Sequence, residues 1–293
     1  GAPMTAVNDA RILDRGYRRF EGARSGVPGA VRSTAWHTTR SVLGLGRKAR
    51  HKIAPVVVII VAFLPAVVFV GLTAFIGDEI FEPGELIPEF AELPRNSFAA
   101  VLLFVGLVAP EALVRDRRDG MLALYLSTPL TRVTYLLSKL IAVVGVLAII
   151  VVLPTVMYLL GLTFAAAGPD GFGNWIEVLV RILGSGLAAS LVYALVSMAC
   201  SSVTDRRAFA SVAVILFMLG LSIVAGVLVE EAEMSVNYYL LDPLGIPLEM
   251  VERMFGADGE YPEISTVNVY GANAAWVAGS AALVWSRYRK AGA

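Results

Sequence analysis

The sequence predicts an all-α membrane protein with six transmembrane helices and both termini on the cytoplasmic side. Its mean hydropathy is +0.72 and only 16% of its 293 residues are charged, whereas about a quarter are charged in an average soluble protein. The chain also contains six apolar runs long enough to approach the width of a bilayer. Lys and Arg gather in the segments between alternate runs, which is the pattern of cytoplasmic loops.

A transmembrane helix needs about 20 apolar residues. The six runs are residues 54–76, 97–114, 140–164, 176–202, 208–229 and 268–285. The second and sixth are the shortest, and we expect them to use flanking residues. Pro65 and Pro154 fall inside the first and third runs, where each removes a backbone donor and predicts a kink. The fourth run is rich in Gly, Ala and Ser, which predicts close packing against neighbouring helices.

Charge supports an even number of spans. Of the 24 Lys and Arg residues, 21 lie before the first run, in residues 111–139, in residues 204–207 or after the sixth run. The segments in between, residues 78–92, 170–177 and 230–263, carry 17 of the 24 acidic residues. Six spans with both termini cytoplasmic place nearly all basic segments on one side, whereas five or seven would divide them.

Two regions follow from this count. Residues 1–53 form a basic cytoplasmic region, and residues 54–293 form the transmembrane domain. Residues 10–24 predict either a helix in the headgroup plane, with its arginines on anionic lipid, or a disordered basic tail.

Motifs of enzymes are absent from the sequence. It contains no G-x-x-x-x-G-K-[ST] phosphate loop, no H-E-x-x-H and no G-x-S-x-G, and one Cys with two His provides no metal-binding pattern. Glu177 and Arg181 are ionisable residues inside the fourth run, and their spacing of four favours an ion pair on one helix face over a substrate contact. We therefore predict no catalytic residue, no metal and no cofactor in this chain.

The segment of residues 111–139 between the second and third runs is the most informative part of the chain. A charged cluster, a glycine, a leucine-rich turn and a proline follow one another in it. The residues in question are Glu111, Arg115, Gly120, Met121, Leu122, Leu124, Tyr125, Pro129, Arg132 and Lys139. The apolar residues after the glycine predict a short helix over 121–126 with more apolar surface than a bare connector needs, which indicates a protein partner.

This order of residues resembles the loop between the second and third spans of ABC type-2 transporter permeases. In that family the loop forms the coupling helix, which rests on the nucleotide-binding subunit. The sequence departs from the family pattern in two ways: arginines are as frequent as acids before Gly120, and Met121 stands where a threonine is common.

The resemblance implies the permease subunit of an ATP-driven ABC exporter in the cytoplasmic membrane of a bacterium. The expected partners are two copies of an ATP-binding subunit, which bind ATP and Mg, a second permease that is either identical or different, and membrane lipid, but no nucleic acid. It also implies a translocation path lined by the second and fifth spans. Here these residues are Phe98, Leu102, Phe104, Val105, Phe209, Leu216, Phe217 and Met218. So apolar a lining favours a drug, lipid or peptide as substrate.

Two further elements are expected from the family. A connecting helix precedes the first span, for which residues 33–52 are the candidate, with Trp36 and Leu43 as apolar anchors. A structured outer segment joins the fifth and sixth spans, and here Asp242 and Pro243 predict the start of a short helix that ends before Gly256.

Two other classes of function are open at this point. A secondary carrier or channel without an ATPase would show internal repeats and charges at the membrane midplane, and neither is visible in the sequence. A non-transporting membrane scaffold would recruit a cytosolic protein through the same loop.

Overall fold

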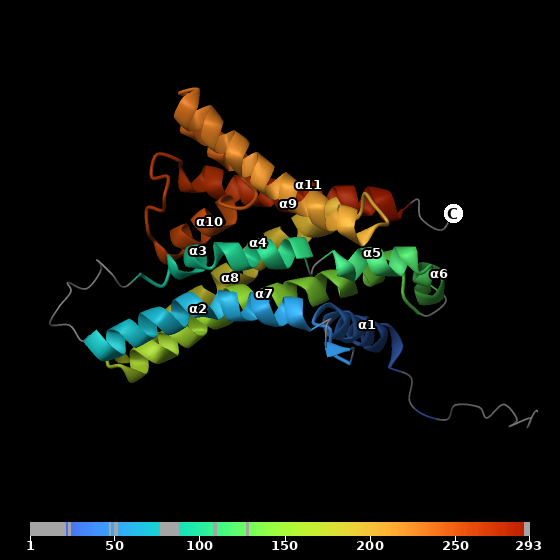
Figure 1. Cartoon of the computed structure of the whole chain (residues 1–293), viewed down its shortest axis with the longest axis horizontal. Coiled ribbons are helices and arrows are strands. Elements are labelled where there is room, and N and C mark those ends of the chain that lie inside the picture. Colours follow the sequence, from blue (N-terminus) through green and yellow to red (C-terminus); the bar gives the residue numbers. More distant parts are fainter. Residues whose placement is uncertain are drawn as a thin grey trace, which may run out of the picture.

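The computed structural model describes residues 22, 25–46, 48–49, 52–76, 88–107, 110–126 and 129–289. Within these residues the fold is all-helical and contains no strand, as the sequence predicts. Figure 1 shows most of the long helices running roughly along the long axis of the molecule, with α9 inclined to them. The short helices α5 (Glu111–Arg118) and α6 (Met121–Leu126) lie at one end of this bundle, and α3 (Leu93–Asn96) and α10 (Ile246–Phe255) lie toward the other.

Five helical segments of the described chain are long and apolar enough to cross a membrane. They are α2 (Ile53–Ile76), the segment Phe98–Arg118 that combines α4 (Phe98–Leu107) with α5, α7 (Arg132–Phe164), α8 (Gly171–Ser201) and α9 (Arg207–Gly226) with the π-helical turn Val227–Glu231. The sixth predicted run forms α11 (Thr266–Tyr288), which has 23 residues but carries polar side chains such as Asn273 and Ser280. Five spans are thus supported by length and composition, and the sixth remains a prediction.

The third span begins two turns earlier than the sequence analysis placed it. Thr134 N donates to Thr131 Oγ1 (3.2 Å) and Thr131 N donates to Thr134 Oγ1 (2.8 Å), which forms a capping box at the start of α7. Arg132 and Lys139 therefore lie on a helix rather than on a loop. The fourth span also begins earlier, at Gly171 instead of residue 176.

The centre of the bundle is formed by α7 and α8, which are packed closely. A Cβ atom on Gly186 of α8 would lie 2.6 Å from Val152 Cγ2 of α7, so that only glycine fits between the two helices here. Ala189, Ser190 and Ala194 follow it as buried residues. The prediction that the small residues of the fourth run mediate close packing is confirmed.

The outer segment between α9 and α11 contains the predicted short helix. Asp242 Oδ1 accepts a hydrogen bond from Leu244 N (2.9 Å) just before α10, and Gly256 ends the helix in the left-handed region with φ +85°. Tyr193 of α8 donates its hydroxyl hydrogen to Leu244 O (2.7 Å), and Arg181 Nη1 donates to Phe255 O (2.7 Å). Both bonds hold the outer segment against the membrane helices.

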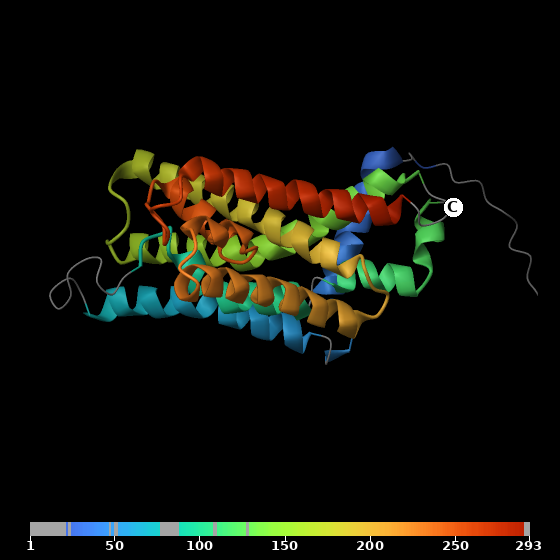
Figure 2. The ribbon, with the colours of Figure 1, turned by 90° about the horizontal axis from the view of Figure 1, so that it is seen from above.

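Helix α1 (Gly26–Val42) crosses the long axis of the bundle, as Figure 2 shows. It begins earlier than the predicted helix over residues 33–52, and it also ends earlier, because Gly44 and Gly46 adopt positive φ angles of +68° and +80° and turn the chain. Trp36 is 62% exposed, whereas Leu43 packs against the hydrophobic core. The predicted helix over residues 10–24 lies outside the described residues, apart from Gly22.

Candidate functional site

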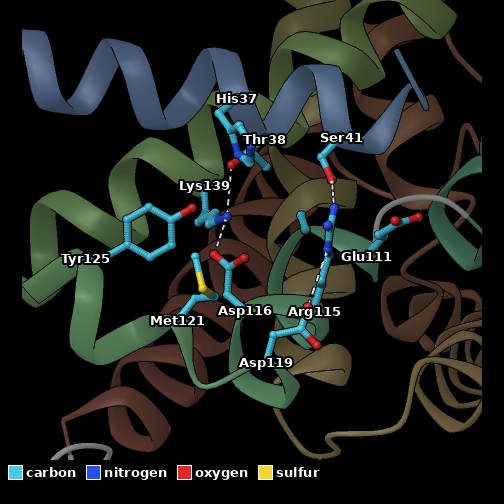
Figure 3. Close-up of a pocket in the computed structure, with 11 residues that line it drawn as sticks. His37, Thr38, Ser41, Glu111, Arg115, Asp116, Asp119, Met121, Tyr125 and Lys139 are labelled. Carbon is cyan, nitrogen blue, oxygen red and sulfur yellow. Dashed lines mark hydrogen bonds and ion pairs between the residues drawn. The ribbon is translucent and has the colours of Figure 1, made fainter. Parts of the chain in front are cut away.

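Helices α5 and α6 form a tight corner at the end of the bundle. Gly120 makes the corner with φ +66°, a conformation that favours glycine, and the predicted helix over residues 121–126 is present as α6. A cavity of about 100 Å³ lies behind the corner. Figure 3 shows that its walls come from α1, α5, α6 and the start of α7.

A buried ion pair lies at the centre of this site. Lys139 Nζ is 2.6 Å from Asp116 Oδ2, and the side chains are only 2% and 12% exposed. Tyr135 donates its hydroxyl hydrogen to the same carboxylate oxygen (2.9 Å), and Lys139 Nζ donates to Thr38 Oγ1 of α1 (2.9 Å). One carboxylate and one ammonium group thus join α1, α5 and α7. The sequence analysis assigned no role to Asp116.

Aromatic rings complete the cluster. The centroids of Tyr125 and Tyr135 are 5.4 Å apart, and Lys139 Nζ lies 5.6 and 5.5 Å from them. These separations lie within the range of cation–π attraction. Burial, and in second place the nearby charge of Asp116, raise the pKa of Tyr125. Helix α6 is therefore anchored to the buried ion pair through its own tyrosine.

The side chains of α6 divide into two groups. Met121 and Tyr125 are half-buried and line the cavity. Leu124 is 59% exposed. The side chain of Leu122 lies outside the described part of the chain. Leu124 is therefore the described exposed member of the apolar surface that the sequence predicts on this helix.

The arginines of α5 differ in their roles. Arg115 Nη1 donates to Ser41 Oγ of α1 (2.9 Å), and its Nε lies 3.6 Å from Asp119 Oδ2. Arg117 lies 2.8 Å from Asp205 and also donates to the carbonyl of Ser202, so that it joins α5 to the turn between α8 and α9. Arg118 is 61% exposed, and its Nε lies 3.0 Å from Oδ1 of the adjacent Asp119.

The other predicted residues of the loop are placed around the corner. Glu111 lies 3.3 Å from Arg207 at the start of α9. Arg132, in the first turn of α7, donates to Arg289 O (2.6 Å), while Pro129 is exposed. The corner is therefore connected to the start of α9, and the start of α7 is connected to the end of α11.

The residues predicted to line a translocation path differ in their exposure. Phe104, Val105 and Met218 are buried in the core, and α4 and α9 approach so closely that a Cβ on Gly106 would lie 2.3 Å from Ile215. Phe98 and Leu102 are partly buried against the same core. By contrast, Phe209, Leu216 and Phe217 are 60%, 67% and 39% exposed on α9.

A second charged cluster, which the sequence analysis missed, lies at the opposite end. Arg95 of α3 donates to both carboxylate oxygens of Glu252 (2.8 and 3.0 Å), pairs with Glu260 and lies 3.6 Å from Glu249. Arg253 binds Glu249 (3.0 Å) and donates to Tyr261 O (2.9 Å). Burial alone would lower the pKa of Arg95, but the hydrogen bonds and charge of Glu252 raise it. The isolated arginine among acidic residues on the predicted outer side was the available signal.

A family model described as "ABC-2 family transporter protein" matches residues 93–285, from the start of α3 into the last turn of α11. The match includes both charged clusters and the α5–α6 corner. No curated protein matches the chain. Proteins of this family are membrane components of ABC transporters and normally work with an ATP-binding subunit. Because the match covers about two thirds of the residues, the chain belongs to the ABC-2 transporter family and is a multi-pass membrane protein.

Proposed function

We propose that the chain is the permease subunit of an ATP-driven exporter, and that α6 is the coupling helix that docks on a separate ATP-binding subunit. The observation that carries this proposal is the α5–α6 corner, which presents Leu124 outward and is fixed from behind by Asp116 and Lys139. A short apolar helix that protrudes beside the membrane suits a groove on another protein.

The Asp116–Lys139 cluster connects the α5–α6 corner to the transmembrane helix α7. Lys139 belongs to α7, whose 33 residues correspond to about 50 Å of helix. A displacement of α6 by the ATP-binding subunit acts on Tyr125, hence on Lys139 and α7, and reaches the far side of the bundle as a rigid-body movement. Such a movement would couple the closure of the ATP-binding subunits to a switch of the path from one side of the membrane to the other.

A second permease, in one homodimer or heterodimer, completes the path in this proposal. Support comes from α9, which presents Phe209 and Leu216 outward, whereas Phe104, Val105 and Met218 pack between α4 and α9 within one chain. We therefore propose that the exposed members of the predicted set face the path and the buried members support it. The lining is apolar, which suits a drug-like, lipidic or peptidic substrate.

The remaining topology follows from the same proposal. Helix α11 serves as the sixth span, because its 23 residues pack against α8 and its last turn ends near the corner. Both termini then lie in the cytoplasm of a bacterium, together with α1, α5 and α6. The outer segment caps the exit, where the Arg95 cluster holds α10 to α3.

Co-purification tests this function against the alternatives. The chain is expressed with a candidate ATP-binding subunit from the same organism, and the purified proteins are reconstituted in vesicles. We expect the two proteins to purify together and an amphipathic fluorescent substrate to move only when ATP is hydrolysed. Substrate movement without that subunit would indicate a carrier or channel, and a stable complex without any transport would indicate a scaffold.

A further inference from the structure

A second hollow lies on the other side of α1, between this helix and α7. It has a volume of about 910 Å³ and is lined by α1 residues that include Pro28, Arg32, Trp36 and Thr39 and by Ile141 and Ala142 of α7. It is separate from the cavity behind the coupling corner, into which His37, Thr38 and Ser41 point from α1 (Figure 3).

The position of this groove relates it to the membrane surface. Ile141 is 49% exposed and follows the buried Lys139 by two residues, at the point where the long apolar part of α7 begins. Helix α1 crosses the bundle axis at this level (Figure 2). Pro28, Arg32 and Trp36 recur every four residues and so share one face of α1. The groove therefore joins a mixed wall on α1, where Arg32 lies among apolar and hydroxyl side chains, to an apolar wall on α7.

The chemistry of the two walls is that of a phospholipid site. Arg32 is exposed, and no carboxylate among the described residues pairs with it. A guanidinium group binds the two oxygens of a phosphate with good geometry. Trp36 is 62% exposed, and tryptophan prefers the level of the headgroups. Ile141 and Ala142 offer a surface for an acyl chain.

We infer that the groove between α1 and α7 binds an anionic phospholipid of the cytoplasmic leaflet, with the phosphate on Arg32 and an acyl chain against Ile141. An anionic headgroup such as that of phosphatidylglycerol fits better than phosphatidylcholine, because 21 of the 24 Lys and Arg residues belong to this side of the predicted topology. Basic pockets at the cytoplasmic ends of membrane helices bind anionic headgroups in this manner. The inference rests on the proposed topology, which places α1 on the cytoplasmic side, and does not depend on the proposed coupling.

The test uses the purified full chain in nanodiscs that contain phosphatidylglycerol and phosphatidylcholine. After mild detergent extraction, native mass spectrometry counts the lipids that remain bound to each protein molecule. The wild type should retain phosphatidylglycerol in preference. One arginine near an anionic membrane surface contributes about 1 kcal/mol to binding. We therefore expect Arg32→Gln to lower the retention of phosphatidylglycerol about fivefold. Arg32→Lys should retain part of it, since the charge remains.

Two further variants test whether lipid retention depends on the groove between α1 and α7. Arg287→Gln removes an exposed arginine at the end of α11, outside the groove, and should behave as the wild type. Ile141→Trp fills the apolar wall and should reduce the retention of both lipids. Equal retention by Arg32→Gln and the wild type, equal retention of the two lipids, or release of the bound lipid by inorganic phosphate alone would each overturn the inference.

Discussion

Replacement of Lys139 by methionine should destabilise the chain strongly, because Asp116 would keep a buried negative charge without its cation. The ammonium group and the carboxylate are 2.6 Å apart, and their side chains are 2% and 12% exposed, so water screens the pair little. Removal of one partner from a buried ion pair costs roughly 3–5 kcal/mol. Tyr135 still donates a hydrogen bond to Asp116 in the variant, which places the expected loss near the lower limit, at about 3 kcal/mol.

The double variant separates charge from packing. Asp116→Asn keeps an acceptor for the Tyr135 hydroxyl, and together with Lys139→Met it leaves no buried charge behind. We expect the double variant to lie within about 1.5 kcal/mol of the wild type, which is far less than the sum of the single losses. Lys52→Met, at an exposed position just before α2, is the matched control and should change stability by less than about 0.5 kcal/mol.

Thermal unfolding of the purified proteins in one detergent measures these differences. A loss of about 3 kcal/mol corresponds to a decrease in Tm of roughly 5 °C for a chain of this size. Two results would contradict a buried centre formed by Asp116 and Lys139. One is a Tm of Lys139→Met equal to that of Lys52→Met. The other is a double variant whose loss of stability equals the sum of the losses of Lys139→Met and Asp116→Asn.

Three other predictions concern topology and the outer cluster. In a Cys200→Ala background, an impermeant maleimide should label outer cysteines in whole cells but not cytoplasmic ones, and labelling of an inner position would refute six spans. The outer replacements are Glu85→Cys and Glu260→Cys, and the inner ones are Asp119→Cys and Arg289→Cys. Arg95→Ala should cost roughly 3 kcal/mol in thermal unfolding, because Glu252 and Glu249 would lose their shared cation while only 5% and 0% exposed; a change as small as that of Arg287→Ala would contradict this. Burial raises the pKa of Glu249 above its usual value of 4.5. Glu249 therefore contributes most to the stability of the fold at low pH, where its side chain is protonated, and this contribution declines as the pH rises through the pKa of Glu249 in the folded state. The Tm of Glu249→Gln relative to the wild type should therefore increase between about pH 4 and pH 7, and a decrease over this range would show that Arg253 outweighs burial.

Much of the fold could be predicted from hydropathy and charge because these patterns reflect the membrane itself. Apolar runs identified five helices that the structure supports as spans, and Gly256 marked the end of the outer helix, which begins at Ile246 and not at Asp242 and Pro243. The start of α7 was misplaced, since hydropathy marks where a helix becomes apolar and not where its hydrogen bonding begins. That start is set by the local capping of Thr131 and Thr134.

The candidate site could be predicted only in part, for a related reason. The order of residues in 111–139 identified the corner and α6, but charged residues in a loop are expected to be solvated. Lys139 and Asp116 are buried together because α1 and α5 both pack against the start of α7. Arg95 likewise meets Glu252 across 157 residues of sequence. Neither pairing follows from local spacing.

The most direct test of the central claim is whether Leu124 of α6 contacts the ATP-binding subunit. Leu124→Asp places a charge at the proposed contact, which should cost several kcal/mol of binding if it is buried there, while the spans are unchanged and the permease should still insert. Leu45→Asp, at another exposed leucine that follows α1, is the control, and Arg118→Ala should have little effect because an exposed charge contributes little. We measure the ATP-binding subunit that co-purifies with each variant and the ATP hydrolysed per substrate transported. The account predicts that Leu124→Asp alone loses the subunit or uncouples hydrolysis from transport, and wild-type binding with wild-type transport in this variant would contradict it.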